Sequence, residues 1–181
     1  IHERLVGSEM CIRDRYYVDG WRLDVAADLG HSSEFNHKFW RDFRKAVKTA
    51  NPEALILAEH YGDPKDWLEK GDQWDTVMNY DAFMEPLTWF LTGMEKHSDE
   101  YIPEKKGKVD DFEGAMRHFM ASFQTSQLQC AMNELSNHDH SRFLTRTNGT
   151  AGRVETHGSE AADYGVNFGI CLLYTSPSPR D

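Results

Sequence analysis

Hydrophobic and polar positions along the interior of the chain follow a pattern that predicts strands alternating with helices. Residues 16–26 indicate a strand, and the run ALILA at 54–58 is typical of a parallel strand buried on both faces. Between them, aromatic and aliphatic residues recur at helical spacing over 35–47, after Ser32 and Ser33, which can cap the start of a helix. This part of the chain therefore predicts a strand–helix–strand unit.

The same alternation continues along the rest of the interior. The pattern predicts a short helix at 67–70, a strand at 75–80, helices at 82–94 and 112–123, a fourth strand at 128–136, and a solvated loop at 97–111. Strands that alternate with helices favour a parallel sheet covered by helices, which places the chain in the α/β class. Four strand–helix units fit half of an eightfold barrel, and they also fit an open doubly wound sheet.

The two ends of the chain differ from its interior. Residues 1–15 and 171–181 show neither helical nor strand periodicity, and both segments resemble translated sequencing-adaptor read-through. We therefore expect both ends to be non-native tails and the folded domain to occupy residues 16–170.

The composition of the chain limits the kinds of molecule that it is expected to bind. The 181 residues include 20 Lys and Arg against 30 Asp and Glu, so the formal net charge is −10, which disfavours binding to nucleic acid. The chain has no run of 18 apolar residues, so we expect no membrane partner. The cysteines have no metal-binding spacing, and no glycine-rich phosphate-binding motif follows a strand. The oligomeric state and the compartment, cytoplasmic or secreted, stay open.

Acids and amides follow every predicted strand. They are Asp24, Glu59, Asn79 with Asp81, and Asn137 with Asp139. In a barrel these strand ends converge on one face, which is where active sites lie. Because neighbouring parallel strands lie about 4.8 Å apart, carboxylates at equal heights on the first two strands should come within roughly 5 to 6 Å of each other. That separation suits a nucleophile and an acid/base that cleave a glycosidic bond without an intervening water.

The surroundings of Asp24 and Glu59 are expected to differ as these two roles require. Arg22 lies two residues before Asp24 on the same strand face, where its charge stabilises an ionised carboxylate able to attack an anomeric carbon. Glu59 enters an aromatic neighbourhood, where burial favours the neutral form that protonates a leaving oxygen. Five aromatic residues near the strand ends can stack on sugars or fill the core, and the core is the better prediction for each one. They are Trp21, Tyr61, Trp67, Trp74 and Tyr80.

Three motifs give these candidates a family context. The chain contains DGWRLDVA, ILAEHYGD and NELSNHDHSR, which resemble in order and spacing the nucleophile, acid/base and transition-state motifs of glycoside hydrolase family 13, the α-amylase superfamily. The resemblance covers most of residues 16–146 and is nearest to the neopullulanase, cyclomaltodextrinase and amylopullulanase-like group. It implies that the chain is an internal fragment and that its fold is a partial TIM (β/α)8 barrel, roughly the second half of the catalytic domain.

The resemblance also implies a function and residue roles. The implied activity is that of a retaining α-glucoside hydrolase on α-1,4 glucans, maltooligosaccharides or cyclodextrins, with α-1,6 bonds as a further option, through a covalent glycosyl intermediate on Asp24. Glu59 is implied as the acid/base, and Asp139 as the carboxylate that engages sugar hydroxyls. The implied substrate-binding residues are Arg22, His138, His60, Tyr61 and Asn137. No cofactor is expected, because the calcium that family members often bind lies near residues upstream. The fragment itself is expected to be inactive, because the preceding barrel strands also supply sugar-binding residues.

Two alternatives to a glycosidase stay open. One is a catalytically silent barrel used for binding, although such proteins typically lose the acids that this chain retains. The other is a metal-dependent hydrolase that uses His138, Asp139 and His140. Adjacent residues on an extended segment point to opposite faces, so the two histidines can converge while Asp139 does not, which disfavours a metal site.

Overall fold

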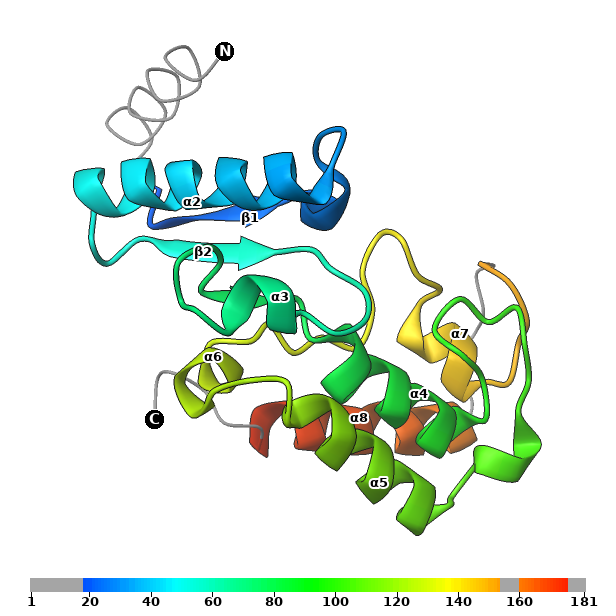
Figure 1. Ribbon diagram of the computed structural model, residues 1–181. Coiled ribbons are helices and arrows are strands. Elements are labelled where there is room, and N and C mark those ends of the chain that lie inside the picture. The colour runs from blue at the N-terminus through cyan, green and yellow to red at the C-terminus, as the bar shows by residue number, and fades with distance from the viewer. Residues whose placement is uncertain (1–17, 154–159, 176–181) are drawn as a thin grey trace. The chain divides into compact units, whose positions relative to one another are not determined.

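The structure of the protein, a computed structural model, describes residues 18–153 and 160–175 (Figure 1). The described chain forms two compact units. Unit 1 contains residues 18–78 and 123–132, and unit 2 contains residues 79–122, 133–153 and 160–175. Within these ranges, no helix combines the length and the apolar character needed to cross a membrane.

Unit 1 is built on a parallel sheet, which confirms the predicted α/β class. Its strands are β1 (Gly20–Leu23), β2 (Leu55–Ala58) and β3 (Thr76–Val77), in the order β1-β2-β3 (Figure 1). In the register, Leu23 lies beside Ala58, and Ala58 lies beside Val77. The carboxyl ends of β1 and β2 are therefore level, which positions the residues that follow them.

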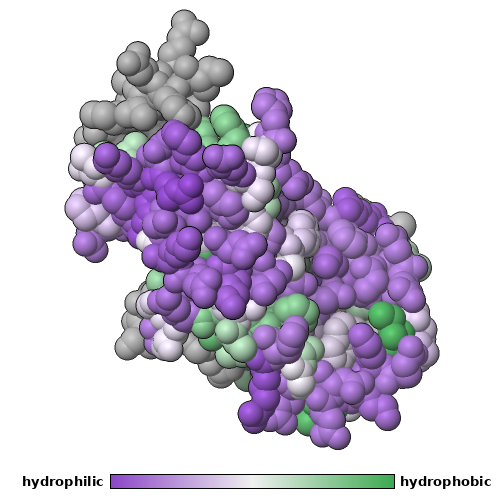
Figure 2. Space-filling model, viewed as in Figure 1, coloured by the Kyte–Doolittle hydropathy of each residue, from purple (hydrophilic) through white to green (hydrophobic). Residues whose placement is uncertain are grey.

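Helix α2 (Ser33–Ala50) joins β1 to β2 and confirms the predicted strand–helix–strand unit. It begins at Ser32, whose side-chain oxygen accepts a hydrogen bond from the Phe35 amide at 3.2 Å, as the capping prediction requires. Trp40 and Val47 on its inner face join the buried core formed with the sheet. Its outer face is charged and exposed, and it is hydrophilic in Figure 2. Burial of one apolar stripe against the sheet is what stabilises such a helix.

Two short helices complete unit 1, and one of them overturns a prediction. They are α3 (Lys65–Leu68) and α6 (Thr125–Gln129). The fourth strand predicted at 128–136 is wrong: within the described residues this segment contains the end of α6 and a single parallel bridge from Met132 to Met78. Four strand–helix units were predicted, but the described residues contain three strands. A side-chain hydrogen bond favours the helical turn, because the side-chain oxygen of Gln127 accepts a hydrogen bond from the backbone amide of Gln124 at 2.9 Å.

Unit 2 is helical. It begins with a π-helical turn (Tyr80–Met84) and continues with α4 (Glu85–Thr92), a 3-10 turn (Pro103–Lys105), α5 (Val109–Met120), α7 (Phe143–Thr147) and α8 (Glu160–Thr175). Helix α4 packs against α5, α7 and α8 (Figure 1). Helices α4 and α5 confirm the two predicted in this region, and Pro86 is tolerated because it lies in the first turn of α4.

The predicted limits of the folded domain fall partly outside the described residues. The segment 1–15 lies entirely outside them. Of the segment 171–181, residues 171–175 form the last part of α8 and the rest lie outside. The assignment of both ends to non-native tails stays a prediction.

An ion-pair network lies near the amino-terminal ends of β2 and β3 in unit 1. The Asp75 carboxylate lies 2.6 Å from Arg44 Nη1 and 2.8 Å from Lys48 Nζ, and it accepts the Ile56 backbone amide at 2.9 Å. Burial raises the pKa of Asp75, but the hydrogen bonds from Lys48, Arg44 and Ile56 outweigh burial, so its pKa lies below the ordinary 3.8. The stability that Asp75 contributes is therefore complete above pH 3.8 and is lost as the pH falls through the lower pKa of the folded protein.

Replacing Asp75 with asparagine is expected to destabilise the protein by about 2 to 4 kcal/mol, because an amide cannot satisfy two cations and a backbone N–H together. The measurement is the midpoint of urea unfolding of the complete protein that contains this chain. Asp42→Asn is the matched control, since Asp42 pairs with Lys38 on the exposed face of α2 at 2.6 Å and its loss should cost less than about 1 kcal/mol. Equal midpoints for the two variants would refute the structural importance of Asp75.

Candidate active site

The candidate residues of unit 1 lie at the carboxyl ends of β1 and β2. Asp24 directly follows β1, and Glu59 directly follows β2. The strand pairing extends one step further, because the Glu59 amide donates to the Leu23 carbonyl at 2.8 Å and the Ala26 amide donates to the Glu59 carbonyl at 3.3 Å. The backbone of Glu59 is thus held by hydrogen bonds to Leu23 and Ala26, the residues that flank Asp24 and Val25.

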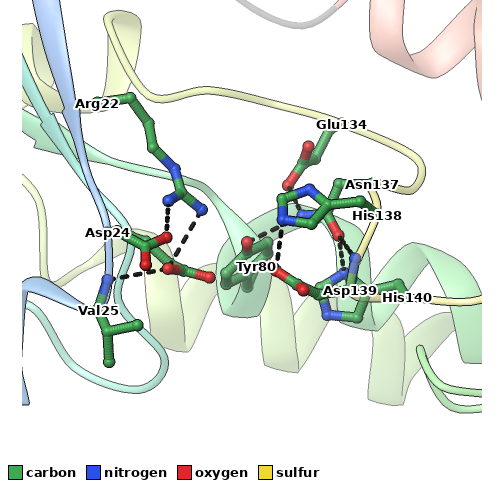
Figure 3. A network of polar contacts seen from close by, with 10 residues as sticks. Arg22, Asp24, Val25, Tyr80, Glu134, Asn137, His138, Asp139 and His140 are labelled. Carbon is green, nitrogen blue, oxygen red and sulfur yellow. Dashed lines mark hydrogen bonds and ion pairs between the residues drawn. The ribbon is translucent and has the colours of Figure 1, made fainter.

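Arg22 contacts both carboxylates. Its Nη1 forms an ion pair with Asp24 Oδ1, and its Nη2 lies 3.2 Å from Glu59 Oε2. Figure 3 shows the guanidinium of Arg22 directed at Asp24, as the two-residue spacing on one strand predicts. A single guanidinium thus contacts both acids, which follow adjacent parallel strands.

The two carboxylates differ in their access to solvent. The side chain of Asp24 is 77% exposed, whereas that of Glu59 is 6% exposed. Asp24 is therefore open to a ligand, and Glu59 is enclosed by the protein. This contrast was expected from the aromatic residues that follow Glu59 in the sequence.

Val25 is a residue of the site that sequence analysis missed. Its φ of 41° and ψ of 45° lie in the left-handed region, which costs a β-branched residue about 1 to 3 kcal/mol. In this conformation its backbone amide donates to Glu59 Oε2 at 2.9 Å (Figure 3). No sequence pattern predicts a valine in the left-handed conformation, so the contact between the Val25 amide and Glu59 is seen only in the folded structure.

Some of the aromatic residues that follow Glu59 in the sequence lie in the core, and others lie at the surface. Trp67 and Trp74 are stacked, with ring centroids 4.8 Å apart, and the His60 ring lies 4.9 Å from Trp67. Trp74 is completely buried, so it belongs to the core, whereas Tyr61 is 43% exposed. Of the aromatic candidates, Tyr80 is also buried, and Trp21 and Trp67 are partly buried against the core. The prediction of core over sugar platform therefore agrees with the burial of Trp74 and Tyr80.

A separate group of candidate residues lies in unit 2, in a segment that contains Asn137, His138 and Asp139. The Asp139 amide donates to Asn137 Oδ1 at 2.9 Å, and His138 Nε2 lies 3.3 Å from Asp139 Oδ2 (Figure 3). The side chains of His138 and Asp139 are 76% and 44% exposed. Both can therefore reach a ligand, as the resemblance implies, while the Asn137 amide is engaged within the protein.

The geometry of this segment does not support the metal-hydrolase alternative. His138 is exposed and faces Asp139, whereas His140 is buried and its Nδ1 lies 2.6 Å from Asn137 Oδ1. The two histidines thus have different partners and do not converge. Across the part of the chain that the structure describes, no three or more His, Cys, Asp or Glu side chains are grouped to hold a metal ion.

The fold and the candidate residues of unit 1 indicate a class of protein. Carboxylates at the carboxyl ends of adjacent parallel strands, both in contact with one arginine, lie where the active sites of barrel enzymes are found. The family profile of the alpha-amylase catalytic domain matches residues 9–174. The chain belongs to this family of O-glycosyl hydrolases.

Individual similar proteins support the assignment to this family. Neopullulanase 2 of Thermoactinomyces vulgaris is 38% identical over 132 residues, which cover 73% of this chain and 19% of that protein. Cyclomaltodextrinase of Geobacillus thermopakistaniensis is 35% identical over 161 residues, which cover 84% of this chain and 24% of that protein. Among solved structures, the type III pullulan hydrolase from Thermococcus kodakarensis has a TM-score of 0.76 at 26% identity, over 97% of this chain and 27% of that chain. The chain thus spans about a quarter or less of these curated relatives.

Proposed function

We propose that this chain is part of the catalytic domain of an α-glucan hydrolase that cleaves glycosidic bonds with retention of configuration. The observation that supports this proposal most directly is the shared contact of Arg22 with Asp24 and Glu59 at level strand ends. An inverting enzyme needs a wider separation, which leaves room for a water between its carboxyl groups.

In the proposed reaction, Asp24 and Glu59 act in two steps. The exposed Asp24 carboxylate attacks the anomeric carbon, and the bond to the leaving oxygen breaks as Glu59 transfers its proton to that oxygen. Glu59 then takes a proton from water, whose oxygen attacks the anomeric carbon and releases Asp24. Arg22 holds both carboxylates in place, and the Val25 amide orients Glu59.

Other residues are proposed to act on the substrate. Asp139 is the proposed carboxylate that engages sugar hydroxyls, with His138 beside it. Tyr61, as an exposed ring, is a proposed stacking surface, and His60 lies next to it against the Trp67 ring. Asn137, whose side-chain amide is engaged within unit 2, is proposed to support the segment of Asp139 without contact with the sugar.

The complete protein is proposed to contain a (β/α)8 barrel, of which the three described parallel strands are part. The proposed substrates are α-1,4 glucans, maltooligosaccharides and cyclodextrins, with α-1,6 bonds as a further option. The names of the relatives, neopullulanase and cyclomaltodextrinase, support this substrate class.

Proton NMR of the first product tests the stereochemistry. When the complete protein hydrolyses a maltooligosaccharide, the α-anomer of the new reducing end is expected to appear first, and mutarotation to the β-anomer follows later. The experiment records anomeric signals during the first minutes of the reaction, with an enzyme-free sample of the α-anomer as the control for mutarotation. Initial formation of the β-anomer would overturn the retaining mechanism.

A further inference from the structure

His140 is a buried residue that the proposed reaction does not use. It is 3% exposed and follows directly after Asp139. Its ring meets the ring of Tyr80 edge-on at 5.2 Å and lies 4.9 Å from the ring of His97. Its Nδ1 lies 2.6 Å from Asn137 Oδ1.

The hydrogen bonds of Asn137 determine which way its side-chain amide points. Its Nδ2 donates to the Tyr80 hydroxyl oxygen at 2.9 Å and to Glu134 Oε1 at 3.0 Å. Its Oδ1 accepts the backbone amide of Asp139 at 2.9 Å. Because a backbone N–H can only donate, Oδ1 must be the acceptor on that side, and the amide has one orientation. Figure 3 shows this side chain between Tyr80, Glu134 and the backbone of Asp139.

The orientation of Asn137 also determines the protonation of His140. Since Asn137 Oδ1 only accepts, His140 Nδ1 must carry the hydrogen in this contact. Burial, together with the charges of His97, Arg146 and Lys96, lowers the pKa of His140 to about 4, although the charge of Asp139 acts in the opposite direction. His140 is therefore neutral near pH 7, and its neutral form is the tautomer with hydrogen on Nδ1.

A second buried group holds the start of the same segment. Arg146 is completely buried, its Nη2 donates to the Leu135 carbonyl, and its Nη1 donates to Thr88 Oγ1 at 2.7 Å. The segment that contains the exposed His138 and Asp139 is thus attached to the interior on both sides. Exposed side chains on a loop hold a fixed geometry only when buried neighbours hold their backbone.

We propose that His140 is a positioning residue, whose Nδ1–H fixes the Asn137 amide so that Asn137 holds the backbone of Asp139. This inference rests on the proposed role of Asp139 in binding the sugar. Asn137 then acts by holding Asp139 and not by direct contact with the substrate, since its side-chain nitrogen and oxygen are both engaged within unit 2.

Two substitutions at position 140 separate the hydrogen-bond donor from the ring. In His140→Asn the side-chain nitrogen occupies the place of Nδ1, so the bond to Asn137 is kept, whereas in His140→Gln the nitrogen is displaced towards the place of Nε2. Both variants remove the imidazole from Tyr80 and His97, so the position of the donor is the main difference between them. In the complete protein, His140→Gln is expected to lower kcat on a maltooligosaccharide about 30- to 100-fold with KM changed less than about threefold, because misplacement near 1 Å costs about this much. His140→Asn is expected to stay within about fivefold of the unsubstituted protein.

Hydrogen–deuterium exchange of residues 137–140, measured by mass spectrometry, provides a readout that does not depend on activity. We expect exchange of the Asp139 amide to be about tenfold faster in His140→Gln and unchanged in His140→Asn. Unchanged exchange in His140→Gln, or exchange equally fast in both variants, would overturn the positioning role. If His140→Gln does not fold, His140→Asn decides, and loss of protection or of kcat in that variant overturns the proposal.

The two proposals fail in different ways. If the unsubstituted protein shows no glucan hydrolysis but the exchange pattern is as expected, the proposed function is wrong and the structural part of the inference is supported. If the protein is active and both variants match it in kcat and exchange, the positioning role is wrong and the proposed function stands.

Discussion

Replacing Asp24 with asparagine is expected to lower kcat of the complete protein about 10⁴-fold or more, because the amide cannot form the covalent glycosyl intermediate. The effect should be on chemistry and not on folding. Asp24 is 77% exposed, and asparagine retains the side-chain oxygen that contacts Arg22. The melting temperature should therefore change little, since exposed ion pairs contribute only about 0 to 1 kcal/mol.

Two measurements test the assignment of Asp24. The first compares kcat of Asp24→Asn with that of Asp110→Asn, which removes an exposed aspartate in the first turn of α5 and should leave activity unchanged. The second uses a fluorinated glycosyl fluoride, whose enzyme-bound intermediate is long-lived, and identifies the labelled peptide by mass spectrometry. Label on a residue other than Asp24, or a variant that keeps more than a tenth of its turnover, would contradict the assignment.

Replacing Glu59 with glutamine is expected to lower kcat on an unactivated maltooligosaccharide about 10²- to 10⁴-fold, because proton transfer to the leaving oxygen is lost. The structure makes this a clean substitution. Glutamine retains an oxygen to accept the Val25 amide, which donates at 2.9 Å, and it can remain in the buried position of Glu59. The loss should therefore report acid/base catalysis and not a displaced backbone.

The choice of substrate separates the role of Glu59 from that of Asp24. Fluoride leaves without a proton, so Glu59→Gln should hydrolyse α-maltosyl fluoride with a far smaller loss in the first step, whereas Asp24→Asn should lose both substrates. Glu53→Gln, an exposed glutamate just before β2, is the matched control and should behave as the unsubstituted protein. Equal losses on both substrates in Glu59→Gln would argue against an acid/base role.

The sequence pattern predicted those elements in which the buried positions recur regularly along the chain. Helix α2 repeats apolar residues at helical spacing and has a capping serine, Ser32, so its position could be predicted closely. The run at 54–58 predicted β2 because burial on both faces leaves no polar position. The segment 128–136 was predicted wrongly, because a short apolar run does not distinguish a strand from a helical turn, and contacts distant in sequence decided it.

The candidate site shows the same division. The order of residues was enough to predict that these groups lie together. Acids that directly follow two strands, with Arg22 two positions before Asp24 on one strand face, meet when those strands pair in parallel register. The orientation of the groups around them could not be predicted and is set by packing in the folded protein. The left-handed backbone of Val25 and the direction of the Asn137 amide each depend on partners far along the chain or on a backbone state that no residue type specifies. Periodicity reports which face of an element is buried, whereas a single hydrogen bond or dihedral angle is set by packing between elements.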